Sequence, residues 1–227
     1  MENRFRFFKF VLTVMFVCFS VTAFSLDGFI PQWTVGQTWH VKAHYRNIHS
    51  KAKKWLEPIT WNFKVRGEKV INGELCYVLQ IVPDQIRHMK TLGILFLSKK
   101  DLHAVKVIDI FQVDGKAKSQ ERIIGGSHIS PLLRNDSMVP YDLPLFPLSA
   151  PASVDNTGAS FGGENAVKID GVNFLEDTSQ TCLSDGKGFV VILRSSNGKG
   201  NMEQKWNPDF PWAVSMTSSA MEYQFEK

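Results

Sequence analysis

Apolar and polar residues alternate with a period of two along much of this chain. In residues 59–66 (ITWNFKVR), Ile, Trp, Phe and Val alternate with Thr, Asn, Lys and Arg, and residues 39–46 (WHVKAHYR) follow the same rule. Successive side chains of a β-strand point to opposite faces of the sheet, so this alternation predicts strands with one buried face. Runs that are apolar at nearly every position predict strands that are covered on both faces. Such runs, and further strand-like ones, lie at 76–82, 92–98, 102–113, 117–124, 166–175 and 189–194.

Turn signals separate these segments. Asn-Gly or Asp-Gly pairs tolerate the positive φ angles of tight hairpins. The last segment, 213–227, alternates twice with a change of phase near Ser218 and Ser219, which we interpret as a β-bulge. Together these signals predict an antiparallel meander of about ten or eleven strands, more than a flat sheet usually holds. We therefore expect a mainly β fold, a curved half-barrel or barrel. The pairs stand at 72–73, 114–115, 170–171, 185–186 and 197–198.

One helix and one long loop interrupt the meander. Residues 83–92 begin with Pro83 and Asp84, a pair that suits the start of a short helix, so we expect at most one or two short helices. Residues 127–163 contain five prolines, which exclude a central strand or a long helix. The same residues are too apolar for a solvated linker. We expect them to plug an open end of the sheet, with a functional lid as the alternative.

The N-terminal sequence predicts an export signal. Residues 1–9 carry three basic residues, residues 10–24 are without charge, and small residues stand near the end of that run. This is the pattern of a secretory signal peptide. Cleavage after Ser25 is favoured over cleavage after Ala23, and an uncleaved anchor is the alternative. Residues 26–227 are then expected to form a single antiparallel β domain, located in the periplasm or cell envelope.

The charge balance of the exported chain is nearly even. The formal charge of +4 falls to +2 when residues 1–25, with three basic residues and one acidic residue, are removed. This small excess gives no reason to expect nucleic-acid binding.

His40 and His44 stand four residues apart, which on a helix would suit a shared metal ion. They lie in an alternating strand, however, where four residues span about 13 Å, so we predict no metal site. The strand period instead places His40, Lys42, His44 and Arg46 on one face. If the strand at 59–66 pairs with it, Lys64 and Arg66 join them. We interpret these six residues as a candidate ligand-binding face for an anionic group, with a solvated surface as the alternative.

Other chemistry-bearing residues give weaker signals. Cys76 and Cys182 are the two cysteines of the exported chain, and we consider a disulfide between them and two buried free thiols equally. The six tryptophans are expected to fill the core, with an aromatic ligand surface as the alternative. Residues 158–162 match G-x-S-x-G, but the segment lacks the strand–helix context and no histidine follows it. No sequence motif for a cofactor was found, and we expect no catalytic residues.

Three stretches carry a family resemblance: 33–41 (WTVGQTWHV), 65–78 (VRGEKVINGELCYV) and 95–107 (LFLSKKDLHAVKV). They resemble patterns of exported bacterial β proteins whose plan is similar to the lipoprotein-carrier fold, a curved half-barrel around an apolar cavity. The resemblance covers about residues 30–115 and implies binding in the envelope, without catalytic residues. We therefore expect a non-enzymatic protein that binds a lipid-like, apolar or amphiphilic ligand, at or near a membrane surface. The alternatives are an interaction module that docks an envelope protein through the Pro-rich loop, and a glycan-acting enzyme.

Overall fold

The computed structural model describes residues 26–47, 55–84, 91–124, 131–133, 137–160, 175–195 and 201–226. The described residues form fourteen strands and no helix. The predicted signal peptide at 1–25 lies outside them, as does most of the predicted strand at 166–175. The strands are β1 (Leu26–Phe29), β2 (Thr38–Tyr45), β3 (Ile59–Ile71), β4 (Glu74–Pro83), β5 (Leu92–Ser98), β6 (Ala104–Val113), β7 (Lys116–Ile123), β8 (Leu148–Ala150), β9 (Ala152–Ser160), β10 (Leu175–Ser184), β11 (Phe189–Ser195), β12 (Met202–Trp206), β13 (Ser215–Thr217) and β14 (Met221–Glu226).

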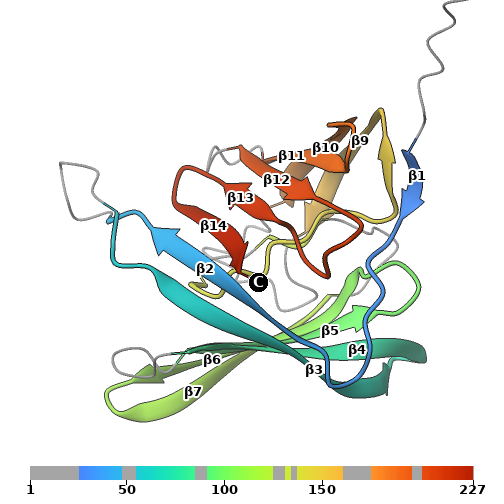
Figure 1. Cartoon of the computed structure of the whole chain (residues 1–227). Helices are drawn as coiled ribbons and strands as arrows, with labels where there is room; N and C mark the ends of the chain where they lie inside the picture. The colour runs from blue at the N-terminus through green and yellow to red at the C-terminus, as the bar shows by residue number, and fades with distance from the viewer. Residues whose placement is uncertain are drawn as a thin grey trace, which may run out of the picture.

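Twelve of the strands form one antiparallel sheet in the order β7-β6-β5-β4-β3-β2-β14-β13-β12-β11-β10-β9, and β1 pairs separately with β8. The sheet is not closed, because β7 and β9 are its two edges. It curls so that β2 to β7 form one wall and β9 to β14 the other (Figure 1). The predicted mainly β fold with a curved antiparallel sheet is confirmed.

The tight turns follow the predicted chemistry. Asn72 and Gly73 both have positive φ angles (50° and 83°) between β3 and β4, and Asp114 and Gly115 (52° and 75°) join β6 to β7 in the same way. This is the backbone that a two-residue hairpin with the twist of a sheet requires. The Asp-Gly pair at 185–186 joins β10 to β11. The pairs at 170–171 and 197–198 lie outside the described residues.

Some predicted elements differ from the structure. The phase change near Ser218 is a turn and not a bulge: the Ser218 amide donates to the carbonyl of Met221, and β13 and β14 pair on either side of it. In the predicted helix region, β4 extends to Pro83 and β5 begins at Leu92, while residues 85–90 lie outside the described part. Four short or polar strands were not expected: β1, β8, β9 and β12. Strands β8 and β9 lie within the Pro-rich loop predicted at 127–163, and β9 and β12 are polar at most positions.

The concave face of the sheet carries the main hydrophobic core. Trp33, Trp39, Trp61, Trp206 and Trp212 are all buried in it. Four of them form a continuous aromatic cluster, in which Trp212 lies 6.1 Å from Trp33, 6.0 Å from Trp39 and 5.9 Å from Trp206 between ring centroids. Core filling therefore accounts for these five tryptophans, as the sequence favoured. Trp55 is the exception among the described residues, being 38% exposed.

The Pro-rich region lies on this concave face. We call residues 131–133 and 137–150 the covering segment; in Figure 1 it runs between the two walls of the sheet. Its apolar side chains belong to the same core cluster as those of the strands, which explains why a loop with five prolines is so hydrophobic. They are Leu132, Val139, Tyr141, Leu143, Phe146, Leu148 and Ala150.

Candidate functional site

The predicted ligand-binding face lies on the outer side of β2 and β3. The two strands pair antiparallel, with His40 opposite Asn62, Lys42 opposite Thr60 and Thr38 opposite Lys64. Side chains of directly opposite residues share a face, so the alternation predicted for β2 is present in the structure. Lys42 and Lys64 are exposed, and His40 and His44 are half-buried.

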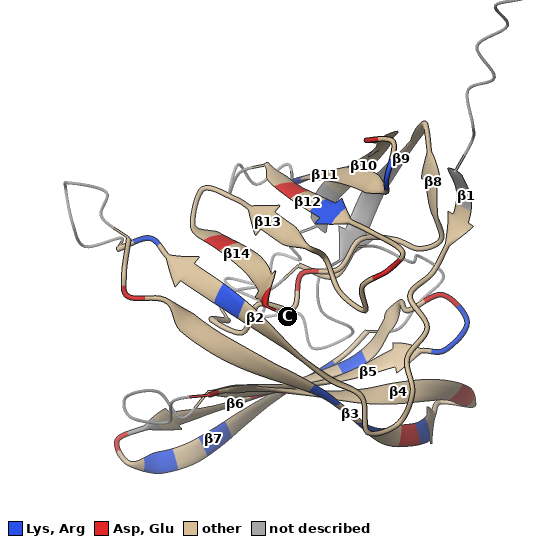
Figure 2. Ribbon diagram, in the orientation of Figure 1, with Lys and Arg blue, Asp and Glu red and all other residues tan. Residues whose placement is uncertain are grey.

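This face is less cationic than the sequence of β2 alone indicates. Strand β14 pairs with the other side of β2 and places Glu226 opposite His40 and Glu222 opposite His44. Lys42 forms an ion pair of 3.6 Å with Glu226. Figure 2 shows this mixture of both signs of charge on neighbouring strands. Two carboxylates thus stand beside the three basic residues of β2, and they would repel an anion that the basic residues attract.

The remaining predicted residues are at the margins of the face. Arg46 lies just past the end of β2, and its guanidinium carbon stands 5.1 Å from the centre of the Trp55 ring, a cation–π distance. Arg66 is exposed at a register shift between Val65 and Gly67. The structure therefore brings His40, Lys42, His44 and Lys64 onto one surface and leaves Arg46 and Arg66 at its ends.

Cys76 and Cys182 are free thiols. Cys76 packs with Phe96 and Val105 in a small second cluster, whereas Cys182 belongs to the main core. The disulfide that was considered is not formed, because the two side chains lie in different clusters. Burial raises the pKa of both thiols, for Cys182 to about 11.

A polar site with no sequence prediction lies where the covering segment meets β6 and β7. The hydroxyl of Tyr141 donates to Asp109 over 3.0 Å and accepts from Arg122, which also contacts Asp109 at 3.2 Å. Ser137 donates to the other carboxylate oxygen of Asp109, also over 3.2 Å. Burial raises the pKa of Tyr141 well above its ordinary value, so the phenol stays protonated and can donate.

Three further side chains of the sheet bind the backbone of the covering segment. Gln180 of β10 accepts from the amide of Leu145 over 2.7 Å and donates to its carbonyl over 3.0 Å. Gln204 of β12 donates to the carbonyl of Asp142 over 2.9 Å, and Tyr45 of β2 donates to that of Met138 over 2.6 Å. These buried polar groups are therefore satisfied by the backbone that they bind.

Sequence reasoning missed this site, although one signal was present. Asp109 interrupts a row of apolar residues on its face of β6, between Val107 and Phe111. A carboxylate in such a row is expected to have a buried partner. Gln180 and Gln204 stand in polar segments, so their inward direction follows only from the pairing of the strands.

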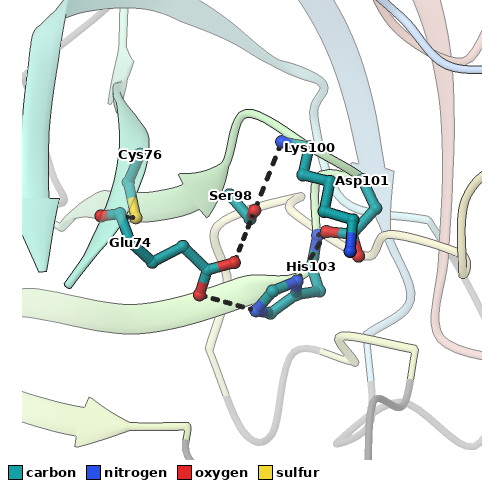
Figure 3. A network of polar contacts seen from close by, with 6 residues as sticks. All are labelled: Glu74, Cys76, Ser98, Lys100, Asp101 and His103. Carbon is teal, nitrogen blue, oxygen red and sulfur yellow. Dashed lines mark hydrogen bonds and ion pairs between the residues drawn. The ribbon is translucent and has the colours of Figure 1, made fainter. Parts of the chain in front are cut away.

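A second cluster joins the turn after β5 to the start of β4 (Figure 3). His103 lies between two carboxylates: its Nδ1 is 2.5 Å from Asp101, and its Nε2 is 3.2 Å from Glu74. Ser98 donates to the other oxygen of Glu74 over 2.8 Å.

This arrangement does not match a hydrolase triad or a metal site. In a triad the second ring nitrogen faces the nucleophile, but here Nε2 of His103 faces Glu74. The two carboxylates lie on opposite sides of the imidazole ring, so they and His103 cannot share one ion. Consistently, the described residues contain no group of three metal-ligating side chains. The cluster, which we call the clamp, connects the turn after β5 to the residue that follows the β3–β4 turn.

Some donors of the concave face have no acceptor among the described residues. They are the indole N–H groups of Trp39, Trp61 and Trp212, all buried. An unpaired buried donor costs about 1–3 kcal/mol, so these groups favour any partner that brings an acceptor.

The chain matches no protein-family model, and searches of the curated proteins and of the solved structures likewise find no match. Within the described residues, no helix is long and apolar enough to cross a membrane.

Proposed function

We propose that this protein is an exported, non-enzymatic binding protein of the cell envelope, which takes an apolar or amphiphilic ligand on the concave face of its sheet. The observation that carries the proposal is the nature of that face. It is apolar and aromatic over many strands, and most of what lies on it is irregular chain. Among the described residues of the covering segment, only Leu148–Ala150 form a strand, β8, which pairs with β1 in a small separate sheet. A ligand would replace the covering segment, wholly or in part.

Two features support an amphiphile in particular. The three indole N–H groups that have no acceptor among the described residues offer hydrogen bonds to a ligand within an otherwise apolar surface. Asp109, Gln180 and Gln204 would lose the partners that the covering segment supplies, although Asp109 keeps Arg122 and Gln204 keeps Trp206. A ligand with polar groups could replace the lost partners. The resemblance of residues 30–115 to half-barrel carriers points in the same direction.

The outer face of β2 and β3 is a weaker candidate, because Glu222 and Glu226 stand beside its basic residues. Docking of an envelope protein through the Pro-rich loop is not favoured either. The apolar side chains that would make such a contact are buried against the sheet.

A reversible crosslink tests the proposal. A Cβ atom on Gly93 of β5 would lie 3.7 Å from the Cβ of Val139 in the covering segment, within the range of a disulfide. The lock variant carries Gly93→Cys and Val139→Cys, with Cys76→Ala and Cys182→Ala to prevent mispairing. Binding of a fluorescent fatty acid is measured by titration, in the oxidised and in the reduced form.

The reduced lock variant should bind the fatty acid, and the oxidised form should bind it at least about tenfold more weakly, because the covering segment cannot leave. The same protein in two redox states is its own control for folding. Equal binding by both forms would place the ligand elsewhere and overturn the proposal. Lipid extraction and mass spectrometry of the protein from its native envelope would then identify the natural ligand.

A further inference from the structure

The occupant of the concave face is bound through its backbone. Gln180 contacts both the N–H and the C=O of Leu145, as a neighbouring strand would. Gln204 and Tyr45 bind the carbonyls of Asp142 and Met138. These contacts come from β10, β12 and β2, so they reach the segment from both walls of the sheet.

The hydrogen bond from the Leu145 N–H to Gln180 indicates which class of ligand fits the concave face. A carbonyl acceptor could belong to an ester or an acid, but Gln180 also accepts a hydrogen bond from an amide N–H. A carboxamide that meets an N–H and a C=O of the same residue is matched to a peptide backbone. A simple acyl chain would leave the oxygen of Gln180 unpaired at a cost of about 1–3 kcal/mol.

The side chains of the segment also meet specific partners. The phenol of Tyr141 contacts Asp109 and Arg122, and the ring of Phe146 packs edge-on against Trp206 with centroids 5.2 Å apart. These two aromatic positions stand five residues apart, on either side of the Gln180 contact at Leu145. The concave face therefore recognises a spacing of side chains in addition to a backbone.

From this geometry we infer that the concave face is a receptor for an apolar peptide with a tyrosine, and that residues 137–150 occupy it in cis. The inference rests on the proposed function, since both require the covering segment to leave, and it names a peptide as the ligand class. The partner is a segment of another chain with a Tyr and a second aromatic residue at the spacing of Tyr141 and Phe146. Binding in trans then competes with the segment in cis.

The test uses a fluorescent synthetic peptide with the sequence of residues 137–150 (SMVPYDLPLFPLSA) and the full chain carrying Tyr141→Ala. The substitution removes the phenol from the cis segment and leaves its site on β6 and β7 intact. Fluorescence anisotropy should show binding at least about tenfold tighter than to the unaltered chain, because competition in cis is weaker. If Tyr141→Ala does not fold, Tyr141→Phe is the milder variant, and it keeps the ring.

Modified peptides separate backbone recognition from simple hydrophobicity. N-methylation at the position of Leu145 removes the N–H that Gln180 binds, and it should weaken binding about tenfold. N-methylation at the position of Phe146, whose N–H has no partner among the described residues, is the matched control and should have a smaller effect. Equal losses with both peptides, or no loss with either, would contradict the inference.

The fatty acid used above distinguishes the two proposals. If the fatty acid binds under redox control and the peptide does not bind, the peptide inference is wrong and the proposed function stands. If the peptide binds to the reduced and not to the oxidised lock variant, the inference is supported. If neither probe binds to either variant, both proposals are wrong.

Discussion

Replacing Gln180 by methionine tests whether the sheet holds the covering segment through its backbone. Methionine has a similar size and no amide, so Gln180→Met removes two hydrogen bonds at little change in volume. The N–H and the C=O of Leu145 then lose their partner inside the fold.

The size of the effect follows from the burial of those two groups. A deeply buried group without a partner costs about 1–3 kcal/mol, and Leu145 is only partly buried, so the lower end applies to each. We expect a loss of about 2 kcal/mol in the free energy of unfolding. For a chain of this length, that corresponds to a fall in Tm of about 4–8 °C.

Urea denaturation measures this loss, with Gln224→Met as the matched control. Gln224 is exposed on β14, so its replacement should change stability by less than about 0.5 kcal/mol. Hydrogen exchange gives a local readout, because the amide of Leu145 should lose protection before the amides of the strands do. A loss below about 0.5 kcal/mol for Gln180→Met, or unchanged exchange at Leu145, would refute the reasoning.

The remaining predictions concern the core, the clamp and the surface. Burial raises the pKa of Cys182 from 9.0 to about 11, so its contribution to stability is fully present below pH 9 and is lost as the pH rises to about 11. Between these two pH values, the urea midpoint of Cys182→Ala should fall less than that of the unaltered protein. Trp212→Ala should cost about 3–5 kcal/mol in urea denaturation, because it removes the centre of the aromatic cluster. His103→Leu removes the ring that bridges Asp101 and Glu74 and should raise hydrogen exchange in the turn after β5, while the β10–β11 hairpin stays unchanged. Lys42→Ala should change stability by less than about 0.5 kcal/mol, since its ion pair with Glu226 is exposed; a loss above 1 kcal/mol would contradict this.

Local chemistry made much of the fold predictable. The pair Asn72-Gly73 predicts a hairpin turn from local chemistry alone, because Asn and Gly readily accept the two positive φ angles that the turn requires. The alternation in β2 likewise fixes which side chains face inward. The strong apolar character of the Pro-rich loop was sufficient to predict that it is not a solvated linker. We predicted that it plugs an open end of the sheet, whereas its apolar side chains join the core of the concave face.

The parts that sequence could not predict depend on contacts between distant residues. The segment around Gln180 (TSQTC) is polar at most positions, so which of its side chains face inward follows from its pairing with β9 and β11. Gln180 faces inward because the backbone of Leu145 satisfies it, and these residues are 35 positions apart. Equally, the basic face of β2 looked stronger in the sequence, because the acidic residues of β14 come from the other end of the chain.

The covering segment sets a limit on how tightly any ligand can bind to the concave face. If undocking the segment costs about 3 kcal/mol, only about 1 molecule in 150 has the concave face open. A competing ligand then loses about 150-fold in apparent affinity. A ligand with a nanomolar intrinsic affinity would then bind in the sub-micromolar range. Such a protein would hold its ligand only where the ligand is concentrated, and would release it elsewhere as the covering segment returns. Substitutions that weaken the segment without touching its partners, as Tyr141→Ala does, should therefore tighten ligand binding while they lower the stability of the free protein.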